Sequence, residues 1–393
     1  MSWKVSDPVS EKLRLIVLFQ SGQRSMTSIC QELSISRKTG YKLLKRYEEE
    51  GLEGLKERSR APHFRPRETD REIQQVLIDA RKAHPTWGPR KIKAWLEDRD
   101  DSLELPFPST IGDLFKREGL VHPGRRRRMK SPYGAAPRSE AKEPNQQWDA
   151  DFKGEFRLGN GTYCYPLTVT DNYSRYLLKV HGLPGTGTQG ARRIFDRAFR
   201  EFGLPQSIRT DNGCPFAGSG LGRLSGLSVW WIKLGILLLR GRPHHPEDNG
   251  RHERMHRTLK AETTRPPAAR NRGQQKRFDA FRKEYNHERP HEALDQKPPA
   301  RLYKASSRTY PSRIPDLEYP AHYEVRNVAR GGCFSWHSQV IFVNNCLEGE
   351  RVGLVEFEDG LWKVYFSNLE LGVLDVKRMK GLKTGRVLPM SPV

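Results

Sequence analysis

Apolar residues recur at helical spacing near the start of the chain. Leu13, Ile16 and Val17 fall on one face of a predicted helix. A short helix, a polar turn and a further helix capped by Ser36 follow it. This pattern predicts a helix-turn-helix in an N-terminal domain that spans residues 1–60.

A second helical region, residues 61–123, repeats this organisation. One periodic helix precedes another that has Pro89 near its first turn, where the missing N–H of proline removes no helical hydrogen bond. A third helix is predicted to be capped by Ser109 and to end at Gly119. We expect a second helix-turn-helix or winged-helix domain, followed by a basic linker at 124–144.

The apolar period changes to two near residue 147, which predicts strands. Strands joined by a hairpin turn at 159–161 precede a helix over 189–202 and a further strand over 207–210. Two more helices complete the region. Hairpin strands, a helix, a strand and helices form an α/β order of the ribonuclease H type, and we assign this core to residues 145–305.

The last part of the chain alternates again in short segments. A linker at 306–320 carries Pro and Tyr, and five or six short strands with a tight hairpin at 358–360 are predicted within 321–380. Such closely spaced strands favour a small closed barrel. The expected architecture is multidomain, with N-terminal all-α helix-turn-helix units, a central α/β ribonuclease-H-like core and a C-terminal small all-β barrel.

The composition points to a polyanionic partner. Lys and Arg number 69 against 47 Asp and Glu, for a formal net charge of +22, and such cations release counterions from phosphates. The five cysteines contain no Cys-x-x-Cys pair, so neither a disulfide framework nor a zinc knuckle is indicated. A signal peptide pattern is missing, and the apolar run at 229–239 is too short to span a bilayer, so we expect a cytoplasmic protein.

Basic and polar residues begin the predicted recognition helices. Such residues reach phosphates and base edges when a helix lies in the major groove, and a basic linker is suited to crossing a DNA backbone. An ordinary helical hairpin and a solvated linker are the alternatives to these two interpretations. The candidate DNA-binding residues here are Arg37, Lys38, Thr39, Tyr41, Lys42, Arg90, Lys91, Ser109, Arg125, Arg126, Arg127 and Arg128.

Three carboxylates in the core region come from three predicted elements. Asp151 lies within the first strand, Asp211 just past the fourth, and Glu253 near the start of a helix. Mg²⁺ prefers such hard oxygen ligands, with positions left for phosphate and water. Arg257 and Lys260 share the helical face of Glu253 and are further candidate DNA-binding residues.

These motifs resemble those of the DDE transposases of bacterial insertion sequences, whose core is shared with retroviral integrases. The residues that carry the resemblance are Trp148-x-x-Asp151-Phe-Lys-Gly, Thr210-Asp211-Asn-Gly, Asn249-Gly-x-x-Glu253-Arg and Tyr285-Asn-x-x-Arg289-Pro-His. The resemblance implies a metal-dependent polynucleotidyl transferase that cuts element ends and joins 3′-hydroxyls to target DNA. It also implies terminal inverted repeats as the DNA partner, a homo-oligomer on DNA, no membrane partner and a bacterial, nucleoid-associated location.

Carried over residue by residue, the resemblance makes Asp151, Asp211 and Glu253 the catalytic ligands of two Mg²⁺ or Mn²⁺ ions. Asp149 competes for the role of Asp151, and the Trp-x-x-Asp spacing selects Asp151. Asp171 is interpreted as a turn residue.

Histidines around Glu253 invite a zinc interpretation. We disfavour it because no Cys pair accompanies them, and because we expect the two that flank Glu253 to lie on other faces or at the edge of its helix. The stretch at 236–246 is more apolar than expected for the family. The histidines are His244, His245, His252 and His256.

Two alternative functions remain. One is a metal-dependent ribonuclease or resolvase with the same fold. The two predicted N-terminal helix-turn-helix domains argue against this function. A catalytically silent, transposase-derived DNA-binding regulator is disfavoured by the intact carboxylate triad, whereas the unusual 236–246 stretch leaves it open.

Overall fold

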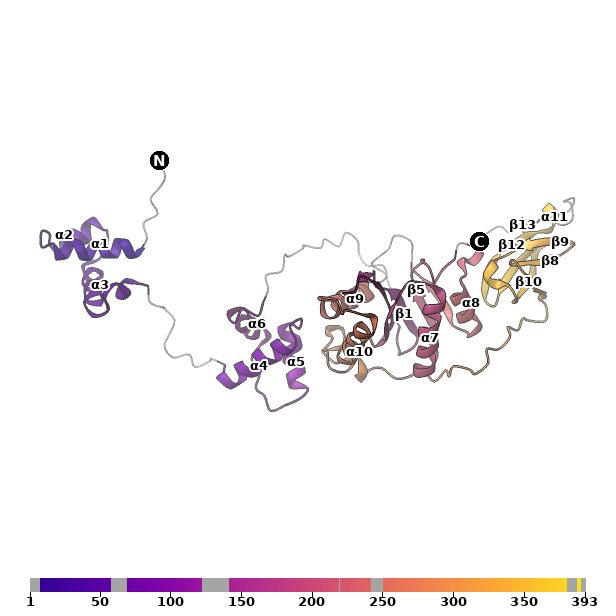
Figure 1. Ribbon diagram of the computed structural model, residues 1–393, viewed down its shortest axis with the longest axis horizontal. Helices are drawn as coiled ribbons and strands as arrows, with labels where there is room; N and C mark the ends of the chain where they lie inside the picture. The colour runs from indigo at the N-terminus through magenta and orange to yellow at the C-terminus, as the bar shows by residue number, and fades with distance from the viewer. Residues whose placement is uncertain are drawn as a thin grey trace. The chain divides into compact units, whose positions relative to one another are not determined.

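A computed structural model describes residues 8–57, 69–121, 141–218, 220–241, 250–379 and 387–389. The chain forms two compact units, Met1–Glu68 and Thr69–Val393, which we describe separately. The expected linker cations Arg125, Arg126, Arg127 and Arg128 lie outside the described residues. Figure 1 labels the helices and strands.

The first unit is a three-helix arrangement with a helix-turn-helix. Ser34, at φ 52°, makes the turn between the second and third helices. The hydroxyl of Ser36 caps the third helix by accepting a hydrogen bond from Thr39 N at 3.1 Å, as its position predicted. A small core that includes Leu15, Ile16 and Ile29 holds the helices together. The helices are α1 (Pro8–Gln20), α2 (Met26–Glu32) and α3 (Arg37–Glu50).

The second unit begins with three further helices around the buried Trp87, Ile92 and Phe115. The predicted cap at Ser109 is wrong. The last helix begins two residues earlier than that cap implies, at Pro108, with Phe107 as its N-cap residue and no side-chain cap. Proline at the first helical position is already set in a helical φ, so it fixes this boundary. The helices are α4 (Arg71–Ala83), α5 (Pro89–Glu97) and α6 (Pro108–Arg117).

A mixed sheet forms the central core, in the order β4-β3-β1-β5-β6, with the short β2 also on β3. The hairpin strands pair antiparallel, and β5 and β6 run parallel to β1. This is the expected ribonuclease-H-like arrangement. The strands are β1 (Gln147–Phe152), β2 (Phe156–Arg157), β3 (Tyr163–Asp171), β4 (Leu177–Leu183), β5 (Ser207–Thr210) and β6 (Leu237–Arg240).

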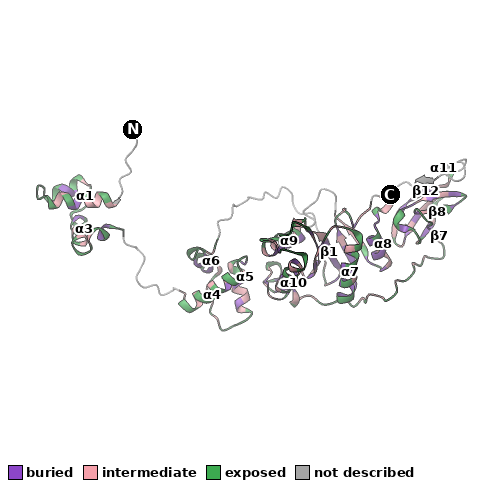
Figure 2. Ribbon diagram, in the orientation of Figure 1, coloured by how far each residue is buried: buried purple, intermediate pink, exposed green. Residues whose placement is uncertain are grey.

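Helices cover both faces of this sheet (Figure 1). On one face, Phe195 and Phe199 pack with Trp148 and Trp231 in the largest core. On the other, Met255 and Leu259 join Phe278 against residues of β3 and β4. Exposed and buried positions alternate around the longer of these helices (Figure 2). The helices are α7 (Thr188–Phe202) and α8 (Gly226–Lys233) on the first face, and α9 (Gly250–Thr263) and α10 (Asn271–His287) on the second.

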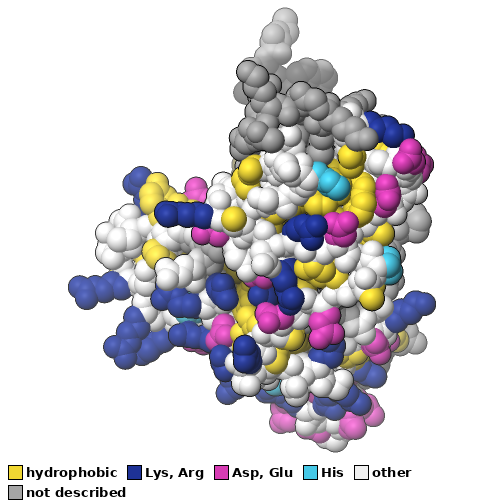
Figure 3. All heavy atoms as spheres, turned by 90° about the vertical axis from the view of Figure 1, so that its right-hand side faces the viewer, with side chains coloured by type: hydrophobic (Ala, Val, Ile, Leu, Met, Phe, Trp, Pro, Cys, Tyr) yellow, Lys and Arg dark blue, Asp and Glu magenta, His cyan; other side chains and the backbone are white. Residues whose placement is uncertain are grey.

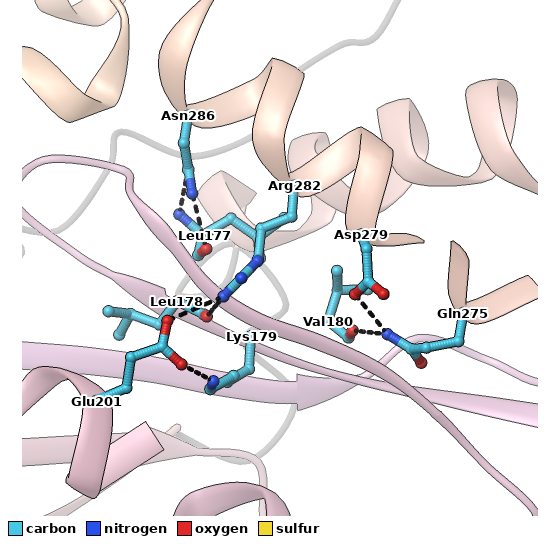
Figure 4. A network of polar contacts seen from close by, with 9 residues as sticks. All are labelled: Leu177, Leu178, Lys179, Val180, Glu201, Gln275, Asp279, Arg282 and Asn286. Atoms are coloured by element: carbon cyan, nitrogen blue, oxygen red, sulfur yellow. Dashed lines mark hydrogen bonds and ion pairs between the residues drawn. The ribbon is translucent and has the colours of Figure 1, made fainter. Parts of the chain in front are cut away.

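Side chains of α10 close the outer edge of β4, whose only strand partner among the described strands is β3. The amide of Asn286 accepts from Leu177 N at 2.8 Å and donates to Leu177 O at 3.0 Å (Figure 4). Farther along the strand, Gln275 donates to Val180 O and Arg282 to Leu178 O. The edge strand is therefore paired by a helix instead of another strand, which protects it from edge-to-edge association.

The C-terminal region is all-β, as predicted, but the expected closed barrel is not what the described strands form. They make two separate sheets, β12-β11-β10-β7 and β13-β9-β8. Both sheets contribute to one core that also takes in Leu224 and Val229 of the central region, so residues outside the C-terminal strands complete this core. The strands are β7 (Glu324–Asn327), β8 (Cys333–Trp336), β9 (Gln339–Phe342), β10 (Arg351–Glu358), β11 (Leu361–Phe366), β12 (Leu369–Asp375) and β13 (Val387–Pro389); α11 (Val376–Met379) follows β12.

Lys and Arg side chains are spread over the face drawn in Figure 3, between apolar and acidic groups. Within the described part of the chain, none of the helices is both long and apolar enough to cross a membrane.

Replacing Asn286 by Leu tests the closure of the β4 edge. The variant leaves the buried N–H and C=O of Leu177 without partners, at about 1–3 kcal/mol each. We expect the Leu177 amide to lose roughly tenfold to hundredfold of its hydrogen-exchange protection. Lys276→Leu, at an exposed position of the same helix, is the control and should leave that protection unchanged. Equal protection in both variants would contradict this role of Asn286.

Candidate active site

The first two predicted carboxylates lie at the same end of two neighbouring parallel strands. Asp151 is in β1, and Asp211 directly follows β5. The register pairs Trp148 with Ile208 and Asp149 with Arg209, and two further steps bring Asp151 opposite Asp211. Because paired strands lie about 4.8 Å apart, these two side chains share one site.

The third carboxylate reaches the site from the opposite layer. Glu253 is exposed in the first turn of α9, which packs on β3 through its other side. Its negative charge acts on Asp151 and helps to raise the pKa of that carboxyl. Three acids from three elements therefore face one region, although they are far apart in sequence.

Burial and like charge raise the pKa of Asp151 to about 7. Burial is the largest cause, the charge of Asp211 comes next, and Lys153 opposes them. Burial also raises the pKa of Asp211, against a hydrogen bond from the Gly213 amide. The site therefore holds more negative charge than its surroundings compensate, which is the condition that a divalent cation relieves.

Two histidines of α9 lie next to Asp151, on the buried side of the helix, whereas Glu253 is exposed on another side. His252 and His256 are four residues apart, so they share a face, and both are buried. Their Nε2 atoms lie 2.6 and 2.7 Å from the Thr168 hydroxyl oxygen. This oxygen is also 3.0 Å from the Asp151 carbonyl oxygen. The hydroxyl has a single proton, so at least one imidazole donates to it.

The histidines stay neutral in this environment. Burial lowers the pKa of His252 to about 4. Burial and the neighbouring His252 also lower the pKa of His256, whose Nδ1 lies 3.7 Å from an Asp151 carboxylate oxygen. Potential ligand atoms of Asp151, His252 and His256 all lie within 4.8 Å of one another, which makes them the metal-competent cluster found among the described residues.

Neighbouring acids are already committed to structural contacts. Asp149 is buried and accepts hydrogen bonds from the side-chain amides of Gln147 and Asn172. Asp171 accepts from Asn145 N at 2.7 Å and from the N–H and hydroxyl of Ser174 at 2.8 and 2.6 Å. Both contact patterns support the assignment of Asp149 and Asp171 to structural positions.

Sequence reasoning missed one cation in the site. Lys153 lies close enough to Asp151 and Lys260 for their charges to affect its own pKa, which burial lowers. It is two residues beyond Asp151, so the strand period places both on one face. Arg257 and Lys260 are exposed on α9, on the same side as Glu253. The strand alternation was the signal that could have identified Lys153.

The predicted DNA-binding residues of the first unit form an exposed set at the start of α3. Tyr41 is 55% exposed although it is a large aromatic residue. In the second unit, Arg90 is exposed and pairs with Glu292 at 3.1 Å, Lys91 is partly buried, and Ser109 is exposed within α6. The exposed α3 residues are Arg37, Lys38, Thr39, Tyr41 and Lys42.

The apolar stretch that departs from the expected pattern contains a strand. β6 (Leu237–Arg240) pairs parallel with β5 and forms an edge of the core sheet. The place of β6 in the sheet therefore explains why this stretch is rich in leucine. Leu237, at the edge of the sheet, is nevertheless 58% exposed. Residues 242–249, which include His244 and His245, lie outside the described part of the chain.

Family models match both the core and the front of the chain. Two models described as an integrase core domain match residues 141–246 and 234–299. A homeodomain-like domain matches residues 39–114, and a helix-turn-helix domain matches residues 11–63. The core region is therefore similar to an integrase core domain, and the region before it is similar to helix-turn-helix domains.

Curated relatives come from mobile elements. An uncharacterized 39.2 kDa protein of insertion element IS476 from Xanthomonas euvesicatoria is 27% identical over 59% of this chain and 64% of its own length. A 31.7 kDa protein of IS407 from Burkholderia multivorans is 26% identical, over 57% of this chain and 78% of its own. The Gag-Pol polyprotein of baboon endogenous virus is 29% identical over 48% of this chain but 10% of its own length. The resemblance to insertion-sequence proteins with an integrase-like core is confirmed.

Solved structures with some similarity are viral integrases. The HTLV-2 integrase catalytic core domain in complex with magnesium is 15% identical, covers 42% of this chain and 99% of its own, and has a TM-score of 0.34. The simian T-cell lymphotropic virus intasome in complex with a PP2A subunit is 15% identical, covers 75% of this chain and 97% of its own, and has a TM-score of 0.37. TM-scores this low carry no argument about function.

Replacing Asp151 by Asn tests the crowding of negative charge. A raised carboxyl pKa means that the folded state binds the proton more tightly than the unfolded state, so stability falls between about pH 4 and pH 7. In EDTA, Asp151→Asn should therefore stabilise the core at pH 8 by roughly 2–4 kcal/mol and near pH 4 by almost nothing.

The measurement is urea unfolding of the full chain at both pH values. Glu104→Gln, which replaces an exposed carboxylate, is the control and should change stability little at either pH. A gain for Asp151→Asn that is the same at pH 4 and pH 8 would rule out a charge effect.

Proposed function

We propose that this chain is a transposase that cleaves DNA at the ends of a mobile element and transfers the strands to target DNA. The observation that carries the proposal is the convergence of Asp151, Asp211 and Glu253 at one end of an integrase core sheet. The insertion-element relatives and the helix-turn-helix front support a DNA substrate.

Asp151, Asp211 and Glu253 would hold two Mg²⁺ or Mn²⁺ ions. The excess negative charge at Asp151 and the oxygen donor set fit such ions. Bound there, the ions would activate a water or 3′-hydroxyl nucleophile and stabilise the leaving oxygen.

The surrounding residues of the chain perform the other parts of the reaction. Lys153, Arg257 and Lys260 provide positive charge beside the carboxylates and would orient the phosphodiester. The neutral imidazoles of His252 and His256 fill the space behind Asp151 and exclude water from its inner side. Thr168 fixes both rings relative to the Asp151 backbone.

The helix-turn-helix unit would recognise the terminal inverted repeats. Arg37, Lys38 and Thr39 begin α3 and are exposed, and Tyr41 follows on the same accessible part of the helix. A recognition helix reads base edges with its N-terminal residues when it lies in the major groove. Pairing of two element ends requires at least two copies of the chain, so we propose a homo-oligomer on DNA.

The catalytic proposal is tested with duplex DNA that carries the repeats flanking the gene, in Mg²⁺ or Mn²⁺. Asp151→Asn, Asp211→Asn and Glu253→Gln should each reduce strand cleavage and transfer by at least roughly a hundredfold, because each removes a metal-coordinating charge. EDTA should abolish both products.

Lys276→Gln, an exposed substitution away from the carboxylates, is the matched control and should retain activity. Wild-type activity in Asp211→Asn would sink the proposed site. Tight binding of the repeats by the wild type without product in either metal would instead favour the silent DNA-binding regulator.

The recognition proposal is tested by removing charge at the start of α3. Arg37→Ala and Lys38→Ala should each weaken binding to the repeats, and each lost phosphate contact should reduce the log–log salt slope by about one. The measurement is fluorescence anisotropy at several salt concentrations. Lys45→Ala, farther along the same helix in an ion pair with Glu49, is the control. An equal loss for all three variants would show that charge, and not the helix start, determines the affinity.

A further inference from the structure

A pocket of about 490 Å³ lies beside α9, between α5 and the segment that follows α10. Six cations and a single acid line it. Its other lining residues include Thr258, Tyr285 and His291. The cations are Lys91, Arg175, Arg251, Arg254, Arg257 and Arg289, and the acid is Glu292.

These cations come from four separate parts of the fold. Lys91 comes from α5 of the second helical region, and Arg254 comes from α9. Arg175 lies in the turn between β3 and β4, which Asp171 organises through its hydrogen bonds to Ser174. The carbonyl of Asn172 accepts a hydrogen bond from Arg175, and its side chain accepts one from Arg251 at 3.0 Å. The pocket is therefore held by fixed backbone elements.

Two acids beside the pocket form ion pairs with arginines. Glu262 pairs with the buried Arg289 at 2.7 Å, and Glu292 pairs with Arg90 at 3.1 Å. Burial, and then the charge of Arg289, lower the pKa of Lys91 to about 8. The Nε2 atom of His291 is buried at the pocket without a protein partner among the described residues. An anion in the pocket would stabilise the charged form of Lys91.

The pocket is distinct from the carboxylate site but adjoins it. On α9, Glu253 and Lys260 lie on the side of the carboxylate site, whereas Arg254 and Thr258 line the pocket. Arg257 borders both, one turn beyond Glu253. A negatively charged chain that leaves the carboxylate site past Arg257 would enter this pocket next.

We infer that this pocket binds backbone phosphates of the DNA strand that occupies the neighbouring carboxylate site. The inference rests on the proposed function and adds to it a phosphate-binding site shared by the core and the second helical region. Several cations that line one pocket are better matched by a phosphodiester chain than by a ligand with a single carboxylate. Such a chain brings a series of phosphates, each with several acceptor oxygens. The homeodomain-like match that includes Lys91 favours DNA over other polyanions.

The test uses the full chain in EDTA, so that it does not depend on catalysis. A labelled short duplex is titrated with the wild type, Lys91→Gln, Arg254→Gln and the control Lys276→Gln. We expect each pocket variant to weaken binding about tenfold near 0.1 M salt and to reduce the salt slope by about one. Lys91→Gln should not lower the melting temperature, because it removes a charge that Arg289 repels.

A second readout reports on the pocket alone. Lysine acylation, followed by mass spectrometry, is compared without ligand, with the duplex and with inorganic phosphate. The duplex should protect Lys91 and leave Lys276 reactive. Equal affinities for the pocket variants and Lys276→Gln, or no protection of Lys91 by the duplex, would overturn the inference. Protection by inorganic phosphate alone would also overturn it and would identify a small-anion site.

These outcomes are separable from those of the proposed function. A chain that fails to cleave or transfer DNA in Mg²⁺ can still show duplex protection of Lys91 in EDTA. Conversely, strand transfer by the wild type, together with wild-type DNA affinity in Lys91→Gln and Arg254→Gln, would support the proposed function and contradict phosphate binding in the pocket.

Discussion

Repulsion among Asp151, Asp211 and Glu253 is the constraint that the core has to satisfy. Burial first, and the neighbouring carboxylates second, disfavour the ionised form of Asp151, and the raised pKa of Asp151 expresses both effects in the folded chain. The elements that carry them must therefore be held together by contacts elsewhere. Parallel pairing of β1 with β5 fixes the first two acids, and the buried face of α9 fixes the third.

That buried face shows how the opposing forces are balanced. His252 and His256 pack on β3 as neutral rings and share the Thr168 hydroxyl, while Met255 and Leu259 join the apolar core. α10 in turn covers α9 and pairs with the edge of β4 through its side chains. The contacts that stabilise α9 thus lie on its inner side and leave Glu253, Arg257 and Lys260 accessible to a substrate.

The elements of the fold could largely be predicted from periodicity, because burial on one face imposes a local pattern. The helix cap at Ser36 and the strands around Asp151 followed from such patterns. The cap at Ser109 and the closed barrel were wrong, and the approach of His252 and His256 to Asp151 was not predicted, since each depends on a neighbour that spacing does not reveal. Lys153 required only the strand period, but the pocket required Lys91, Arg175 and Arg289 to meet although they are up to 198 positions apart in sequence (289 − 91).

The distribution of charge around α9 links these observations. Its outer side carries the acid of a site that needs cations, and the adjoining flank carries cations that need an anion. A metal-bound phosphodiester supplies both charges at once, because its ions neutralise the carboxylates and its phosphates neutralise the arginines. Each half of the surface is electrostatically unfavourable alone, so under the proposed function a DNA strand together with its ions would stabilise both halves. This coupling would make the accessible side of α9 the place where substrate binding and metal binding support each other.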